Sequence, residues 1–264
     1  MTGHIKKVEV CGQTQDYGVS LIKGEIPGES GFTKFGRTPS MPSGASIQDV
    51  WQGSGVYTGQ PVTNVSEIVT ISSSSGNDTA AGTGARTVRI YGLETDLSTE
   101  YTSEDIILNG AALVDSLNTY YRINRVIVLT AGSSGGNEGI ISVAHKITTA
   151  NIFAGVGVGF NQTEIAAWTV AAQRNAILKR VRVALSRSNG SAGSATVTIR
   201  QRDAGQVYRA IRAMEVTTES AVSYTYFSGD LLLPGTDIKV SVEDVSGSNS
   251  IVEAALEFVV YSTA

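Results

Sequence analysis

The stretch Ile251-Val252-Glu253-Ala254-Ala255-Leu256-Glu257-Phe258-Val259-Val260-Tyr261 alternates between two faces along its length. A side-chain period of two is typical of a β-strand with one buried and one solvated face. The stretch is also the most apolar of the alternating segments, so we expect it to lie inside a sheet rather than at its edge. Its inward-facing residues would be Val252, Ala254, Leu256, Phe258 and Val260.

The segments before it carry the same pattern, with turn signals between them at Asn189-Gly190, Asp203–Gly205 and Ser246–Asn249. Short strands separated by such turns are typical of a β-sandwich of jelly-roll or immunoglobulin-like type. We therefore predict a sandwich domain over residues 149–264. Its other strands would be Glu164–Val170, Ala176–Leu185, Ser194–Arg202, Val207–Met214, Ala221–Phe227 and Asp237–Glu243.

A second group of alternating segments predicts a smaller sandwich over residues 64–148, joined to the other by a Gly-rich link at Ile147–Asn161. Asn109-Gly110 is a strong hairpin dipeptide, and it would close the strand that precedes it. The fold class is therefore all-β. The predicted strands of this domain are Val65–Ile71, Arg86–Leu93, Thr99–Leu108, Tyr120–Leu129 and Ile140–His145.

Residues 1–63 differ from the rest, because glycine and proline recur too often for a helical or strand period to persist. A long segment without regular structure is unusual inside a compact domain. We therefore expect an extended N-terminal arm that gains order by lying on another protein. Its candidate anchors are Ile26, Pro27, Phe32, Phe35, Trp51 and Tyr57.

Composition excludes several classes of protein. The net charge is −4, which argues against direct nucleic-acid binding, and a single cysteine rules out an intramolecular disulfide. No apolar run approaches the length of a membrane span, and no apolar signal core follows the first residues. We expect a protein that is made in a cytoplasm and has no membrane partner.

The search for catalytic chemistry finds no convincing site. The only histidines, His4 and His145, are far apart in sequence and cannot form a zinc motif with one cysteine. Gly155–Gly159 lacks the flanking strand and helix of a nucleotide-binding loop. The acidic cluster at Glu94–Asp105 offers carboxylates for a glycoside hydrolase, but a solvated strand edge explains it better. We predict no catalytic residues, no metal ligands, no cofactor and no enzyme.

Two sets of side chains suggest binding instead. The arginines of the second domain are candidates for a subunit interface, where arginine is enriched; the alternative is a set of solvated strand faces. Four aromatic residues could form a carbohydrate-binding platform, although such residues are more often buried in a sandwich core. The interface candidates are Arg180, Arg182, Arg200 and Arg202, and the aromatic residues are Tyr208, Tyr224, Tyr226 and Phe227.

Several segments resemble a family of minor structural proteins of tailed-phage virions. The resemblance rests on turn and strand signatures from Lys23 onward and implies no catalytic motif. They include Lys23-Gly24-Glu25-Ile26-Pro27-Gly28, Asp49-Val50-Trp51-Gln52-Gly53, Asn77-Asp78-Thr79-Ala80-Ala81-Gly82 and Ala131-Gly132-Ser133-Ser134-Gly135-Gly136-Asn137.

The resemblance implies a virion protein of the capsid-decoration or head-fibre type, docked through its N-terminal arm. Its partners would be the major capsid protein or neck and tail proteins, and closed symmetry favours a homo-oligomer, with a trimer expected. The alternatives are a neck or tail component, or a carbohydrate- or receptor-binding module on the virion.

Overall fold

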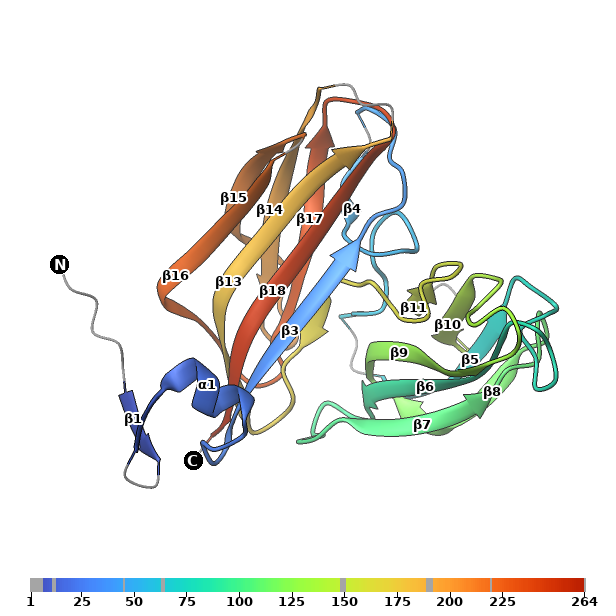
Figure 1. The fold of residues 1–264 in the computed structure, drawn as a ribbon, viewed down its shortest axis with the longest axis horizontal. Coiled ribbons are helices and arrows are strands. Elements are labelled where there is room, and N and C mark those ends of the chain that lie inside the picture. The colour runs from blue at the N-terminus through green and yellow to red at the C-terminus, as the bar shows by residue number, and fades with distance from the viewer. Residues whose placement is uncertain are drawn as a thin grey trace.

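The computed structural model describes residues 7–10, 13–44, 46–62, 65–147, 151–188, 192–218 and 220–263. Within these residues the chain forms strands β1 to β18 and one short helix, α1, and the strand pairs are antiparallel. Two β-sandwiches stand side by side, one elongated and one smaller (Figure 1). The prediction of an all-β protein with two sandwiches is confirmed.

The elongated sandwich consists of two facing sheets. The first has the order β3–β18–β13–β16, and the second has the order β12–β17–β14–β15 with β4 also paired to β17. The first sheet contains β3 (Glu29–Arg37), β18 (Ser250–Ser262), β13 (Arg174–Arg187) and β16 (Ala221–Leu232). The second contains β12 (Ala167–Thr169), β4 (Gln48–Asp49), β17 (Asp237–Val245), β14 (Ser194–Arg202) and β15 (Arg209–Thr217).

The connections make this sandwich a jelly roll. Along the chain, β3, β13, β16 and β18 lie in one sheet, while β4, β14, β15 and β17 lie in the other. The chain therefore crosses between the sheets at every step except the β14–β15 hairpin, as in an eight-stranded jelly roll. The stretch that decided the fold, β18, lies between β13 and β3 and is an interior strand, as predicted.

The smaller sandwich is inserted between β4 and β12 of the jelly roll. One sheet has the order β11–β10–β5–β8 and the other the order β7–β6–β9. The first contains β11 (Ile152–Val156), β10 (Ile141–His145), β5 (Glu67–Ser73) and β8 (Val114–Tyr120). The second contains β7 (Thr102–Ile107), β6 (Ala85–Leu93) and β9 (Arg122–Ala131).

Two expectations about local structure are wrong here. Ile152–Val156 is not part of a link but forms β11, which pairs with β10 and contributes the buried side chains Phe153, Ala154 and Val156. Asn109-Gly110 does not close a hairpin, because β7 and β8 lie in different sheets. Gly110 does adopt the positive φ expected of it, at 60°.

The predicted N-terminal arm also needs correction. Glu29–Arg37 is strand β3, paired along its whole length with β18, and Gln48–Asp49 pairs with β17. The segment looked irregular because glycine interrupts its pattern, yet Gly36 is required by close packing. A Cβ there would lie 2.2 Å from the backbone nitrogen of Ala166. The segment is thus the first part of the jelly roll rather than a free arm.

The first residues that the structure describes stand apart from both sandwiches. β1 (Lys7–Val10) and β2 (Gln13–Asp16) form a hairpin that leads into α1 (Tyr17–Ile22), beside the start of β3 (Figure 1). Asp16 caps the helix by accepting hydrogen bonds from the backbone N–H groups of Gly18 and Val19. Helix α1 has one buried apolar residue, Leu21, while Ile22 is 85% exposed.

Candidate functional site

Three of the six predicted arm anchors pack inside their own chain, two of them buried and one partly buried. Phe32 packs against Trp168, with ring centroids 5.2 Å apart, and belongs to the jelly-roll core. Trp51 and Tyr57 are buried in the core of the inserted sandwich, where the Tyr57 hydroxyl donates to the backbone oxygen of Phe153 at 2.6 Å. Trp51 and Tyr57 are therefore unavailable as anchors on another protein, and the partly buried Phe32 is engaged in core packing.

The remaining anchors are accessible. Pro27 is exposed, Ile26 is partly exposed, and Phe35 is 38% exposed on the outer side of β3. Of the three, Phe35 lies on a regular element, so its position is fixed by the pairing of β3 with β18.

The four predicted interface arginines separate into different environments. Arg180 and Arg182 are exposed on the outer face of β13. Arg200 lies on the other sheet and pairs with Glu243 at 2.6 Å. Arg202 is only 5% exposed and forms a buried ion pair with Asp237. The structure therefore supports only Arg180 and Arg182 as surface candidates.

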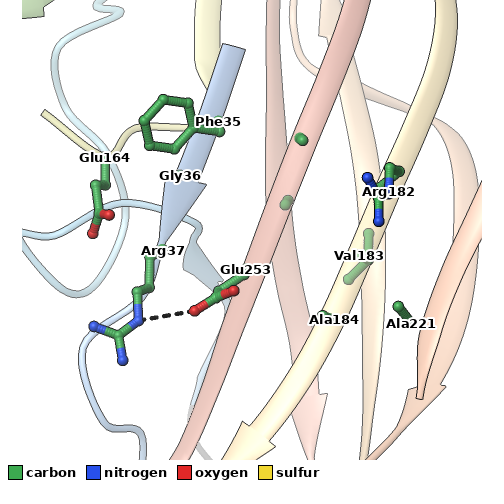
Figure 2. A pocket seen from close by; sticks show the side chains of 11 residues that line it. Phe35, Gly36, Arg37, Glu164, Arg182, Val183, Ala184, Ala221 and Glu253 are labelled. Carbon is green, nitrogen blue, oxygen red and sulfur yellow. Dashed lines mark ion pairs between the residues drawn. The ribbon is translucent and has the colours of Figure 1, made fainter. Parts of the chain in front are cut away.

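Phe35 and Arg182 belong to the same surface. Both are register partners of Ala255 on β18, so they flank this small residue from the two neighbouring strands. Figure 2 shows the two side chains on either side of β18. Sequence reasoning had assigned them to separate features, an arm and an arginine cluster, and the fold brings them together.

A shallow groove of about 270 Å³ runs along this surface. Its floor contains the small residues Ala184, Ala221 and Ala255, and Arg37 pairs with Glu253 beside it at 3.2 Å (Figure 2). We call this surface, lined by Phe35, Arg37, Arg182, Glu253 and the three alanines, the outer groove.

The charges of the outer groove are not all satisfied. Arg37 is paired with Glu253, and Arg180, next to the groove, pairs with Glu257 at 3.5 Å and donates to Thr225. Arg182 has neither a hydrogen bond nor an ion pair with any residue that the structure describes. An exposed aromatic ring, small residues and an unpaired guanidinium are a combination that favours a protein interface.

The joint between the two sandwiches is built from buried charges. Asp237 of β17 accepts hydrogen bonds from Arg122 of the inserted sandwich and from Arg202 of β14. Both guanidinium groups also donate to the backbone of the entering segment at Gln60 and Pro61. Bidentate pairs of this kind fix geometry as well as charge, so the inserted sandwich is held firmly against the jelly roll. Sequence reasoning missed this joint, because its residues are far apart in the chain.

The acidic cluster does not assemble a catalytic pair. Asp105 binds Arg89, whose hydrogen bonds hold the pKa of this carboxyl below its usual value. Glu104 accepts hydrogen bonds from the backbone N–H groups of Leu117 and Asn118, and Glu100 pairs with Arg174. Each of these three carboxylates thus has its own structural partner.

The aromatic platform does not form as a set. Tyr226 is buried, and Tyr224 packs edge-on against it with Arg212 stacked on both rings. Tyr208 instead stacks on Arg202 and Lys239 near the joint. The side chain of Phe227 lies outside the described residues.

The remaining features give no sign of bound metal. Among the described residues, no group of three His, Cys, Asp or Glu side chains could hold a metal ion. His145 is buried against Phe153, and burial lowers its pKa, while His4 and Cys11 lie outside the described part of the chain. No helix in the described ranges is long and apolar enough to cross a membrane.

Comparison with known proteins gives little further guidance. No protein-family model matches the chain, and no curated protein matches it. Weak structural likenesses include the Yersinia pseudotuberculosis-derived mitogen, at 12% identity over 34% of this chain and 80% of that one, with a TM-score of 0.19. Infectious bursal disease virus, Gt strain, is matched at 12% identity over 93% of this chain and 78% of that one, with a TM-score of 0.24. The PBSX exported protein XepA is matched at 11% identity over 86% of this chain and 86% of that one, with a TM-score of 0.20. These TM-scores are too low to support an argument about fold or function.

Proposed function

We propose that this chain is a non-enzymatic structural protein of a tailed-phage particle, of the capsid-decoration or head-fibre type. The observation that carries the proposal is the outer groove, where exposed Phe35 and unpaired Arg182 flank a floor of small residues on a rigid sheet. The resemblance of the sequence to minor virion proteins supplies the setting. In this setting the partner would be another virion protein, with the major capsid protein as the first candidate.

The chemistry of the outer groove defines what the partner must offer. Arg182 calls for a carboxylate, because a buried, unpaired guanidinium would cost more than the contact gains. Phe35 and the alanine floor call for an apolar side chain that fits a shallow depression. An acidic residue next to an apolar one on the capsid surface would meet both requirements.

The two sandwiches would have different roles in this arrangement. The jelly roll would dock through its outer groove, while the rigid joint at Asp237 would keep the inserted sandwich in a fixed orientation. We also propose that the chain acts as a homo-oligomer, with a trimer as the expected state, because closed symmetry is the rule for such components.

The proposal is tested by incorporation into particles. Phage lacking the native copy would be grown with the wild-type chain or with Arg182→Glu or Phe35→Ser, and the purified particles analysed for the ratio of this chain to the capsid protein. We expect each variant to reduce that ratio by at least about tenfold, since a hot-spot truncation costs roughly 2 kcal/mol or more.

The matched control is Arg209→Glu, which reverses the charge of an exposed arginine on β15, in the other sheet. It should be incorporated like the wild-type chain. Full incorporation of both groove variants would overturn the proposal that the outer groove docks on the particle. Absence of the wild-type chain from particles would overturn the virion assignment itself.

A further inference from the structure

A second depression, separate from the floor of the outer groove, lies where strand β3 faces the inserted sandwich. It encloses about 250 Å³. Phe32 and Trp168 line it from the jelly roll, and Tyr91 and Tyr101 line it from the inserted sandwich. We call this depression the joint cleft. Its aromatic walls and small volume are typical of a site for a small molecule rather than for a protein segment.

Lys34 places a buried amine at the joint cleft, and this amine is a cation when it is protonated. Its side chain is 6% exposed, and its ammonium group donates to the backbone oxygen of Asn124. An ammonium has three donors, and Lys34 forms no ion pair with any other described residue. Burial, together with the nearby Arg125 guanidinium, lowers the pKa of Lys34 to about 7.

Two more donors in the joint cleft are incompletely used. The side-chain nitrogens of Asn124 and Trp168 are buried and make no hydrogen bond of good geometry within the described residues. Both lie near the hydroxyl of Tyr101, which donates its own proton to the backbone oxygen of Thr169 at 2.8 Å. Burial raises the pKa of Tyr101, while these two neighbouring groups oppose that effect.

The charge balance of the joint cleft is one-sided. Its lining includes two cations, Lys34 and Arg125, and no carboxylate among the residues that the structure describes there. A buried cation without a partner is costly, so a bound anion would remove an existing penalty. The aromatic walls would at the same time favour a flat or ring-shaped body.

We propose that the joint cleft binds a small ligand in which one carboxylate is attached to a ring. The carboxylate would accept hydrogen bonds from Lys34 and from the side-chain N–H groups of Asn124 and Trp168, and the ring would lie between the aromatic walls. Two sources share this chemistry: a sugar acid of a surface glycan and an aromatic acid. Phe35 lines both the joint cleft and the outer groove, but the inference uses none of the groove's other residues and does not depend on docking on a particle.

The two tryptophans of the chain provide a direct readout. The indole N–H of Trp51 donates to the backbone oxygen of Gly55 at 3.0 Å, away from the cleft, whereas that of Trp168 is free to respond. Indole signals would be followed by ¹H–¹⁵N NMR on the full chain and assigned with Trp51→Phe. The probes are phenylacetate, glucuronate and N-acetylneuraminate, with phenylacetamide and glucose as uncharged counterparts.

We expect at least one carboxylate to shift the Trp168 signal with a dissociation constant of about 1 mM or lower, leaving Trp51 unchanged. Binding of phenylacetate alone would identify an aromatic acid, and binding of a sugar acid would identify a glycan source. Lys34→Met should weaken binding at least about tenfold and Arg125→Gln several-fold, while the surface control Arg209→Gln should have no effect.

Three results would overturn the proposal. They are failure of all three carboxylates to shift Trp168, equal binding of the uncharged counterparts, and unchanged binding by both Lys34→Met and Arg125→Gln. Arg125 is exposed, so its variant still tests the site if Lys34→Met fails to fold.

Discussion

Arg122, on β9 of the inserted sandwich, forms a buried ion pair with Asp237, on β17 of the jelly roll, with Nη2 and Oδ2 3.1 Å apart. Both residues are almost fully buried, at 1% and 2% exposure. Asp237 is also the partner of Arg202, so one carboxylate pairs with two guanidinium groups at the joint. Asp237 is therefore the acidic centre of the joint, which is also held by the hydrogen bond from the Tyr101 hydroxyl to Thr169 and by the ion pair between Arg174 and Glu100.

Replacing the Asp237 carboxylate should strongly destabilise the folded chain. Asp237→Asn keeps the shape but leaves Arg122 and Arg202 buried without a counter-charge, and breaking such a pair costs about 3–5 kcal/mol. We expect the free energy of unfolding, measured by urea denaturation, to fall by this amount. The inserted sandwich should also unfold in a separate, earlier transition, because its main polar link to the jelly roll is lost.

The control for this prediction is Asp105→Asn, which breaks the exposed pair with Arg89. An exposed ion pair contributes about 1 kcal/mol or less, so this variant should stay close to wild type. Equal effects of the two substitutions would contradict the role given to the joint.

A second prediction concerns Asp78, which is fully buried and fastens two loops of the inserted sandwich together. Its carboxylate accepts hydrogen bonds from Ser73 and from the backbone N–H groups of Ala85, Glu138 and Gly139. Burial acts to raise the pKa of Asp78, but these hydrogen bonds outweigh it, and the pKa is lowered. The ionised form is thus favoured by folding.

The contribution of Asp78 to the stability of the fold therefore depends on pH. A lowered pKa in the folded state adds stability above the unfolded pKa of about 4, and this stability is lost as the pH falls through the folded value. Asp78→Asn should lose about 3 kcal/mol at pH 7, with a smaller difference from wild type near pH 2. Thermal unfolding at the two pH values measures this, with exposed Asp115→Asn as the control. A constant difference between Asp78→Asn and wild type would refute the prediction.

A third prediction uses Lys34, whose pKa falls from its ordinary 10.5 to about 7 in the folded chain. Between these values the unfolded chain binds a proton that the folded chain does not, so stability rises with pH across this window. Arg125 is a fixed positive charge facing Lys34, and the phenol of Tyr101, with its raised pKa, stays neutral there.

Lys34→Met should remove this dependence. Near pH 6 the variant should melt several degrees above wild type, because wild type must then hold a buried charge. Near pH 9.5 the difference in melting temperature between Lys34→Met and wild type should be smaller. The comparison needs thermal melts at both pH values, and Lys146→Met, whose amine is exposed, is the control. If the melting temperatures of wild type and Lys34→Met differ by the same amount at every pH, the prediction is wrong, and charging Lys34 does not destabilise the folded chain.

The sequence revealed the strands with regular alternation but not their arrangement. Ser194–Arg202 was predicted with the bounds that β14 has, since its apolar residues Ala195, Val197 and Ile199 occupy alternate positions. Strand β3 was missed because an inward-facing lysine, Lys34, and Gly36 break the apolar period. Strand β4 has only two residues, which is too short for an alternating pattern of apolar and polar residues to be seen in the sequence. The pairing of both with strands some 200 positions later depends on tertiary structure, which local patterns cannot encode.

The candidate site was visible in part. Arg180 and Arg182 are two residues apart on one strand, so their common exposed face could be predicted from the period. Arg202 looked like another surface arginine because its partner, Asp237, comes from a different strand. The approach of Phe35 to Arg182 across β18 followed from no local signal, since it depends on β3 pairing with the last strand of the chain.

The final prediction concerns truncation of the N-terminal segment. Removing residues 1–61 would delete β3 and β4, leaving β18 as an edge strand and Trp168 and Phe258 without the ring of Phe32. We expect this variant to aggregate or to lose its cooperative thermal transition, since an exposed apolar edge strand invites association. Removing residues 1–15 keeps the helix cap at Asp16 and the whole jelly roll, so it should melt within a few degrees of wild type.

The different stabilities expected for the two deletions determine which of them can test docking. Loss of the longer deletion from particles would follow from misfolding alone and would say nothing about docking. The deletion of residues 1–15 tests the β1–β2 hairpin on a folded chain, with circular dichroism and the melting temperature as the check. If the chain lacking residues 1–61 instead keeps the wild-type melting temperature, β3 is dispensable for the jelly roll, and the N-terminal segment regains the status of a separate arm.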